Sequence, residues 1–255
     1  MKRIETVAHE IDMLIPLVGE TAWFLDIDGT LLELAATPGE VRVERGILAT
    51  LTRLRDSSGG AVALISGRAV AVVDELFAPL RLPAAGQHGI ERRDAAGVTH
   101  YHKAGSQRIA AARQSLTVWA AVRPELLLED KGLSLALHYR QAPAMESEVR
   151  RFVETVVAAS DSELCLQAGK MVIEIKPAGR DKGKAIAEFL EEPPFRGRLP
   201  VFVGDDVTDE YGFKLVNRLG GVSIKVGDGP TGASRRLLDV AAVRRWLVAV
   251  AGRGS

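Results

Sequence analysis

The chain has 255 residues, of which 47% are apolar and 26% are charged, so it has the composition of a folded globular protein rather than a disordered or fibrous one. Its 33 Lys and Arg residues balance 33 Asp and Glu residues, which disfavours a nucleic-acid partner because such proteins usually carry a basic excess. Cys165 is the only cysteine, so an intramolecular disulfide and a zinc site built on several cysteines are both excluded.

Continuous apolar runs alternate with amphipathic stretches in the first and last thirds of the chain. Residues 22–25, 61–65 and 201–203 are uninterrupted apolar runs, which predict strands that are buried on both faces. Helical periodicity is found in five stretches, at residues 45–55, 69–76, 184–190, 209–219 and 240–250. This alternation predicts an α/β fold with a Rossmann-like parallel sheet.

The middle of the chain has a different pattern. Residues 133–140 and 171–176 alternate with a period of two, which predicts an antiparallel sheet with one wet face. Helical patterns at residues 106–122 and 145–158 would cover its dry face. We therefore expect a smaller α+β domain over residues 92–176, inserted into a core formed by residues 1–91 and 177–255.

The N-terminal region does not have the pattern of a secretory signal. Glu5, His9, Glu10 and Asp12 interrupt any apolar stretch there, and the chain contains no run of about 18 apolar residues long enough to cross a membrane. A cytoplasmic protein without a membrane partner is expected. The sequence leaves the oligomeric state open.

The first chemical motif is the pentapeptide at residues 26–30, which directly follows the predicted strand at 22–25. Ligands of open parallel sheets bind outside the carboxyl ends of the strands, which is where this motif falls. Asp26 can attack phosphorus as a nucleophile, while Asp28 can protonate the leaving oxygen and then activate water. The alternative is a simple Asx-turn, which a lone Asp-Gly often forms.

A second acidic stretch follows the predicted strand at 201–203 and contains Asp205, Asp206 and Asp209. Two acidic strand ends in one parallel sheet could converge, and carboxylate oxygens are the ligands that Mg²⁺ prefers. The cation would cancel their mutual repulsion and polarise a phosphoryl group. A helix N-cap is the alternative explanation, and the role of Asp209 is left open.

Two further residues could bind an anion. Ser66 precedes a predicted helix, where its hydroxyl and nearby N–H groups form an anion site. Lys182 also precedes a predicted helix, and it can neutralise a phosphoryl oxygen or hold the nucleophile's carboxylate. Taken singly, an N-cap serine and a solvated lysine would explain these residues equally well.

The order of these motifs along the chain resembles that of the haloacid-dehalogenase (HAD) superfamily of phosphatases. The resemblance implies that Asp26 is the nucleophile, Asp28 is the acid/base, and Ser66 and Lys182 bind the phosphoryl group. It also implies a Mg²⁺ cofactor held by Asp26, by the backbone carbonyl of Asp28 and by Asp205. The inserted domain is similar to the C2-type cap of that superfamily.

Three polar residues of the inserted domain could contact a substrate. Glu129 and Lys131 are two residues apart, so they point to one face if the stretch is extended, and Glu174 lies on the predicted wet face of another strand. Such side chains suit a sugar, whose hydroxyls need hydrogen-bond partners. Ordinary surface charge is the alternative.

A longer resemblance covers residues 25–32, 61–68, 86–89, 131–143, 172–177 and 204–210, and above all the string at 131–140. These segments are similar to those of bacterial trehalose-6-phosphate phosphatases. The resemblance implies a sugar phosphate, trehalose 6-phosphate, as substrate, whose distal glucose is held by three residues: Glu129, Lys131 and Glu174. It also implies that Arg68 and His88 line the entrance to the site.

Two alternatives remain at this point. The first is a phosphatase or phosphomutase of the same fold that acts on another sugar phosphate. The second belongs to another class, a non-catalytic module that binds a sugar phosphate and regulates a partner. The pair of Asp26 and Asp28 argues against the second alternative, because a binding module has no use for an acid/base.

Overall fold

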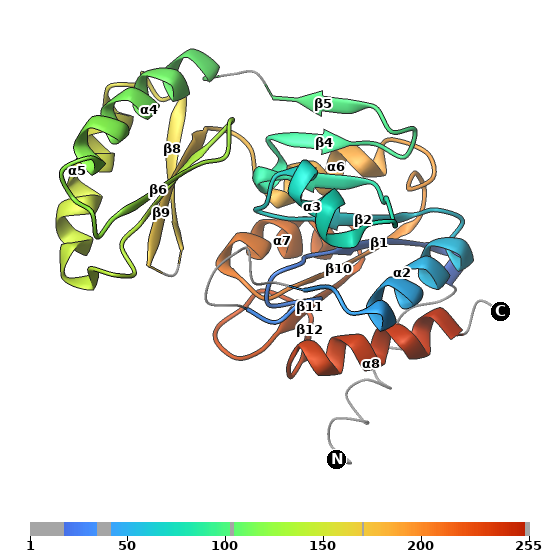
Figure 1. The fold of residues 1–255 in the computed structure, drawn as a ribbon. Helices are drawn as coiled ribbons and strands as arrows, with labels where there is room; N and C mark the ends of the chain where they lie inside the picture. Colours follow the sequence, from blue (N-terminus) through green and yellow to red (C-terminus); the bar gives the residue numbers. More distant parts are fainter. Residues whose placement is uncertain (1–17, 35–41, 103–104, 170, 253–255) are drawn as a thin grey trace. The chain divides into compact units, whose positions relative to one another are not determined.

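The computed structural model describes residues 18–34, 42–102, 105–169 and 171–252, and the chain divides into two compact units (Figure 1). The first unit comprises Met1–His100 and Asp181–Ser255, and the second comprises Tyr101–Arg180. The second unit therefore begins later and ends later than the stretch of 92–176 expected for the inserted domain.

The first unit is built on one eight-stranded sheet with the order β12-β11-β10-β1-β2-β3-β4-β5. Its strands are β1 Thr21–Leu25, β2 Val62–Ile65, β3 Ala84–Gly86, β4 Glu91–Arg93, β5 Thr99–Tyr101, β10 Leu199–Gly204, β11 Val222–Val226 and β12 Arg235–Leu237. The six strands from β12 to β3 are parallel, and β4 pairs antiparallel with β3. The predicted α/β fold with a parallel sheet is confirmed.

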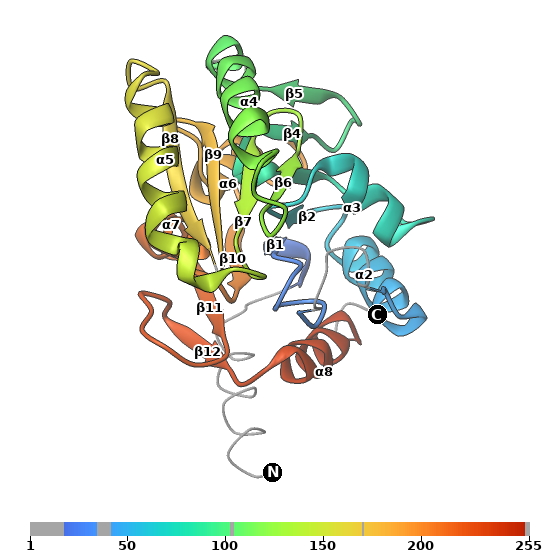
Figure 2. The same ribbon diagram turned by 60° about the vertical axis from the view of Figure 1, so that its left-hand side comes forward.

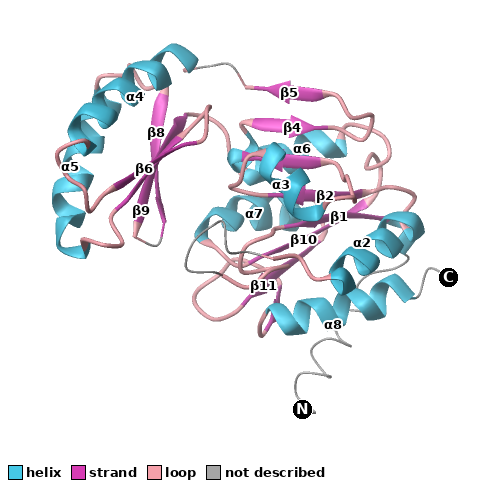
Figure 3. Cartoon of the chain, viewed as in Figure 1, coloured by secondary structure: helices cyan, strands magenta, loops and turns pink. Residues whose placement is uncertain are grey.

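Helices cover both faces of this sheet, as Figures 1 and 3 show. The elements are α2 Arg45–Ser57, α3 Val70–Phe77, α6 Lys182–Leu190, α7 Glu210–Arg218 and α8 Val240–Ala251, with short 3-10 turns η1 Val18–Glu20, η3 Gln87–Gly89 and η5 Val207–Asp209. Along β1, Trp23 and Leu25 pack with α2, α3 and α8, whereas Ala22 and Phe24 pack with α6 and α7. Burial on both faces explains why the strand is a continuous apolar run.

The position of β1 brings the predicted motifs to one edge of the sheet. Leu25 pairs with Leu64 of β2 on one side and with Val203 of β10 on the other. From β1 the chain builds outwards in both directions, so the sheet has its topological switch point here. The loops that follow β1, β2 and β10 are therefore neighbours.

The second unit is a four-stranded antiparallel sheet of order β6-β7-β9-β8. Its elements are α4 Ser106–Ala120, β6 Leu127–Asp130, β7 Leu135–His138, η4 Pro143–Met145, α5 Glu146–Ala158, β8 Leu164–Gly169 and β9 Val172–Pro177. Both helices lie over one face of the sheet (Figure 2) and pack on its leucine and isoleucine side chains.

The wet face predicted for β9 is wrong at two positions. Glu174 and Lys176 are each only 5% exposed. Both have polar partners, because the Ser134 hydroxyl donates to Glu174 and the Lys176 ammonium donates to the Arg180 carbonyl. A charged side chain is buried here at a cost that its hydrogen bonds offset.

Within the described residues, no helix has the length and apolar character needed to cross a membrane.

Candidate active site

A buried ammonium group lies between two buried carboxylates at the carboxyl edge of the parallel sheet. The Nζ atom of Lys182 is 2.8 Å from Oδ1 of Asp26 and 2.7 Å from Oδ1 of Asp209. These side chains are 3%, 5% and 0% exposed, so Lys182 is not the solvated lysine that the sequence left open. Asp209, whose role was also open, is one of its two ion-pair partners.

Asp205 completes a group of three carboxylates. Asp26, Asp205 and Asp209 each offer an oxygen, and these oxygens lie within 4.8 Å of one another. The Thr30 hydroxyl is 3.4 Å from both Asp26 and Asp205. Two acidic stretches at opposite ends of the sequence therefore meet, as the motif analysis predicted.

The electrostatics of this group favour a bound cation. Burial raises the pKa of Asp26 well above its usual range, against the attraction of Lys182, and Asp209 and Asp205 raise it further. Burial, followed by repulsion from Asp209, raises the pKa of Asp205 to about 6. Three carboxylates thus share one ammonium, and their all-oxygen donor set fits Mg²⁺.

Two glycines allow the acidic loops to come this close. A Cβ built on Gly29 would lie 2.1 Å from Oδ2 of Asp205, and one built on Gly204 would lie 2.3 Å from Cγ of Asp209. Gly29 also has a φ of +78°, a conformation that glycine adopts without the steric cost of a side chain. The Asp-Gly and Gly-Asp pairs of the sequence are thus requirements of the packed site.

Asp28 points its carboxylate to a different partner. The guanidinium of Arg68 binds it through two parallel bonds, Nε to Oδ2 and Nη2 to Oδ1, both 2.7 Å long. The Asp28 carboxylate is therefore not among the three that could hold a metal ion. The backbone N–H of Arg68 donates to the Ser66 hydroxyl at 3.0 Å, which ties Arg68 to the predicted anion-binding loop.

His88 lies against the same loop. It adopts a left-handed conformation with a φ of 56°, and its backbone N–H donates to the Ser66 carbonyl. A Cβ on Gly67 would be 2.8 Å from the His88 ring, so the two loops pack in contact. Ser66, Arg68 and His88 are thus brought together next to β2 and β3.

The second unit carries its own polar cluster. Oε2 of Glu174 is 3.2 Å from the Lys131 ammonium, and Oε1 accepts from the Ser134 hydroxyl at 2.7 Å. Glu129 lies 2.8 Å from His138, and this hydrogen bond holds the pKa of Glu129 below its ordinary value. The cluster contains the three predicted sugar-binding residues.

The strand register explains how they meet. Glu129 of β6 and Glu174 of β9 both pair with Ala136 of β7, one from each side. Ser134 and His138 are each two residues from Ala136, so they share its face. The prediction did not single them out, although the period-two pattern puts them on the polar side of the strand.

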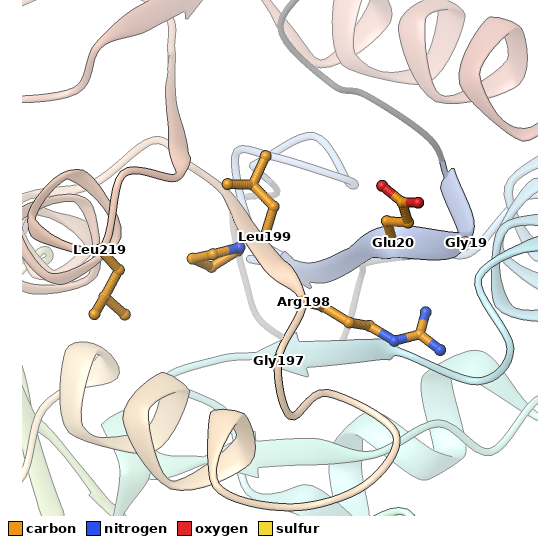
Figure 4. A pocket seen from close by; sticks show the side chains of 7 residues that line it. Gly19, Glu20, Gly197, Arg198, Leu199 and Leu219 are labelled. Carbon is orange, nitrogen blue, oxygen red and sulfur yellow. The ribbon is translucent and has the colours of Figure 1, made fainter.

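A hollow of about 570 Å³ lies elsewhere in the first unit (Figure 4). Its lining residues are Gly19, Glu20, Gly197, Arg198, Leu199, Pro200 and Leu219. These residues adjoin the starts of β1 and β10, at the amino edge of the sheet. The hollow is therefore at the opposite edge from the carboxylates and is not part of the candidate site.

The parallel sheet, its switch point at β1 and the carboxylates that converge there define a phosphatase of the HAD superfamily. The family model described as trehalose-phosphatase matches residues 24–240 of the chain, a range that includes Asp26, Asp28, Ser66, Lys182, Asp205 and Asp209. The chain belongs to the trehalose-phosphatase family of phosphoric monoester hydrolases.

Several named proteins are similar over most of their length. The chain is 47% identical over 231 residues to a trehalose-6-phosphate phosphatase of Escherichia coli, covering 91% of this chain and 86% of the relative. It is 47% identical over 219 residues to a probable trehalose-phosphate phosphatase of Sinorhizobium fredii, covering 85% and 81%.

Solved structures agree on the fold. A trehalose-6-phosphate phosphatase related protein superposes with a TM-score of 0.77 at 26% identity, over 91% of this chain and 97% of that one. The C-terminal domain of a Candida albicans trehalose-6-phosphate phosphatase superposes with a TM-score of 0.81 at 19% identity, over 98% and 96%. At that identity the second match bears on the fold alone.

Proposed function

We propose that this protein hydrolyses trehalose 6-phosphate to trehalose and inorganic phosphate through a phosphoryl intermediate on Asp26. Membership of the trehalose-phosphatase family and the names of the 47% identical relatives support this substrate. The observation that carries the mechanism is the buried Asp26 carboxylate, held by Lys182 beside two further carboxylates.

The reaction has two steps. In the first, a carboxylate oxygen of Asp26 bonds to phosphorus while the bond from phosphorus to the sugar oxygen breaks, and Asp28 gives its proton to that oxygen. In the second, water attacks the same phosphorus and gives a proton back to Asp28, and phosphate leaves with Asp26 restored. Asp28 is 31% exposed, which leaves its carboxylate accessible for both transfers.

Asp26, Asp205 and the backbone carbonyl of Asp28 would hold a Mg²⁺ ion. When bound, the ion neutralises the surplus negative charge of the carboxylates and polarises the phosphoryl oxygens. The Asp209 carboxylate, together with Asp26, holds the Lys182 ammonium in place.

The remaining residues have binding roles in this proposal. Lys182 and Ser66 stabilise phosphoryl oxygens at the carboxyl edge of the sheet, and His88 borders them. The second unit acts as the cap: we propose that its cluster of Glu129, Lys131 and Glu174 hydrogen-bonds the hydroxyls of the distal glucose. A sugar hydroxyl left without its partner costs binding energy, so this cluster selects the substrate.

The proposal is tested by phosphate release from trehalose 6-phosphate, beside glucose 6-phosphate and sucrose 6-phosphate, with and without EDTA. We expect strong preference for trehalose 6-phosphate and loss of activity with EDTA, restored by Mg²⁺. Asp26→Asn should fold normally and release no phosphate. Preference for another sugar would reject the substrate, an isomer without free phosphate would indicate a mutase, and binding without turnover would indicate a regulatory module.

A further inference from the structure

The two aspartates at the end of β1 have different cationic partners. Asp26 pairs with Lys182, and Asp28 pairs with Arg68. Two like charges only two residues apart repel each other, and the two pairs draw them to different neighbours. Only the first pair is fully buried, since Arg68 is 12% exposed and Asp28 is 31% exposed.

The Arg68 backbone is held from both sides, so its side chain starts from a fixed position. Its N–H donates to the Ser66 hydroxyl and its carbonyl accepts from Gln87 at 2.9 Å. The Arg68 backbone packs closely against Gly86, because a Cβ on Gly86 would lie 2.8 Å from the Arg68 carbonyl oxygen. From this anchored backbone, the direction of the guanidinium plane is set by the two side-chain bonds to Asp28.

The two parallel bonds then define the plane of the Asp28 carboxylate. A carboxylate has about four acceptor positions on its two oxygens. The guanidinium occupies one on each oxygen, so one on each remains available for a proton. Bidentate contact therefore orients the group without blocking it, which a single contact from a flexible lysine would not achieve.

We propose that Arg68 is a positioning residue for proton transfer: it fixes the Asp28 carboxylate in the direction of the leaving oxygen. This inference rests on the acid/base role of Asp28 in the proposed function. It assigns Arg68 a role distinct from direct contact with the substrate. General acid–base catalysis contributes about 10²–10⁴-fold, and a misplacement of about 1 Å can cost 10²-fold, so the effect of losing Arg68 is measurable.

The acidity of the leaving group separates the two roles of Arg68. The phenol formed from a nitro-substituted ester is acidic, so it can leave as the phenolate without taking up a proton. A less acidic phenol needs a proton from the enzyme as it leaves. If Arg68 orients Asp28, its loss harms the substrates that need the proton. If Arg68 instead binds the phosphoryl group, its loss harms every ester equally, because the phosphoryl group is the same in all of them.

The test is kcat/KM for a series of substituted phenyl phosphates, from 4-nitrophenyl to 4-methylphenyl, with wild type, Arg68→Met, Arg68→Lys and Asp28→Asn. This ratio covers the steps up to departure of the leaving group. We expect Arg68→Met to lose about 10²-fold on 4-methylphenyl phosphate and little on 4-nitrophenyl phosphate. The kcat/KM of Arg68→Met should therefore depend more steeply on leaving-group acidity than that of wild type, and Asp28→Asn should show the same change. Arg68→Lys should recover part of the loss.

A matched control removes another bidentate arginine of the first unit. Arg92 binds Glu192 through bonds of 2.9 and 2.8 Å, so Arg92→Met deletes a similar pair away from Asp28. It should leave the dependence on the leaving group unchanged. Thermal unfolding of each variant identifies any that fail to fold, and in that event Arg68→Lys carries the comparison.

Equal loss across the series for Arg68→Met and Arg68→Lys, or no loss at all, would overturn the inference. In the double variant, Arg68→Met should add nothing to Asp28→Asn on 4-methylphenyl phosphate, and an additive loss would also contradict it. If Asp28→Asn shows the same dependence of kcat/KM on leaving-group acidity as wild type, the acid role in the proposed function is rejected instead. The failure of the inference and the failure of the proposed function are therefore distinguishable.

Discussion

The two units of the molecule organise charge in different ways. In the first unit, Asp26, Lys182 and Asp209 are almost completely buried and each depends on the others. In the second, the cluster is mixed: Glu129 and His138 are 38% and 26% exposed, whereas Glu174 is buried. Removing one member of a buried set leaves an uncompensated charge, whereas a partly exposed residue can be exchanged at little structural cost.

The largest effect should come from Lys182→Met. Without the ammonium, the buried carboxylates of Asp26 and Asp209 face each other, and breaking a buried pair costs about 3–5 kcal/mol. We expect no phosphate release and a large fall in the free energy of unfolding, measured by urea titration. Wild-type stability in this variant would mean that the site is not as interdependent as its geometry indicates.

Gly29→Ala should weaken metal binding through a clash. The new Cβ would meet the Asp205 carboxylate, so we expect the Mg²⁺ concentration for half-maximal activity to rise about 10–100-fold, the range seen when a ligand's support is disturbed. Gly227→Ala is the matched control, with a φ of +74° and nothing within 4 Å of its Cβ. Both variants carry the strain of a positive φ, so a similar shift in the two would exclude the clash as the cause.

In the second unit, Glu174→Gln should affect one substrate only. The change keeps the shape of the side chain that Ser134 and Lys131 contact but removes its charge. A sugar hydroxyl bound there would lose a charged acceptor, and a hydrogen bond to a charged group is worth about 1.5–3 kcal/mol. We expect about a tenfold or larger rise in KM for trehalose 6-phosphate, with 4-nitrophenyl phosphate unaffected. An equal change for both esters would argue against a sugar-selecting cluster.

The smallest effect should come from Asp130→Asn, which removes an exposed ion pair with Arg113. The hydrogen bond from Arg113 lowers the pKa of Asp130, so its stabilisation is present above the ordinary aspartate pKa and is lost as the pH falls through the lowered value. Because the pair is well exposed, we expect a loss under about 1 kcal/mol at pH 7 and unchanged activity. Thermal unfolding at pH 7 and pH 3 measures the stability, and phosphate release measures the activity. A stability difference between variant and wild type that grows at pH 3 would contradict this.

Much of the first unit could be predicted from local pattern alone. The runs at 22–25, 61–65 and 201–203 are strands, and the acidic motifs follow two of them. Strands β3, β4, β5, β11 and β12 were not predicted. In β4, the residues Glu91, Arg92 and Arg93 show no apolar alternation. Their burial depends on partners far away in the chain, such as Glu192 for Arg92.

The first turn of α6 combines a local cap with a contact to a distant residue. The predicted helix at 184–190 begins at Lys182, because the Asp181 side chain caps it by accepting from the Lys184 N–H. Gly183 weakens the helical pattern in the sequence, yet it lies in the helix. A Cβ there would be 2.6 Å from the Tyr211 carbonyl, so the close packing of α6 on α7 requires glycine.

The same reasoning limits what local pattern could say about the site. Sequence order brought Asp26 and Asp205 to neighbouring strand ends, but the partners of Asp28 and Asp209 depend on side-chain directions after folding. The pairing of Arg68 with Asp28 and of Lys182 with Asp209 therefore had no local signal.

The return connection between the two units matters for protein engineering. The second unit ends at Arg180, so a single residue, Asp181, separates it from the helix that carries Lys182. The Lys176 ammonium holds the Arg180 carbonyl, which fastens this joint to β9. A chimera that replaces the second unit with a foreign one should therefore keep an equivalent hydrogen bond at this connection. Without it, the start of α6, which carries the buried Lys182 ammonium, would be less firmly held.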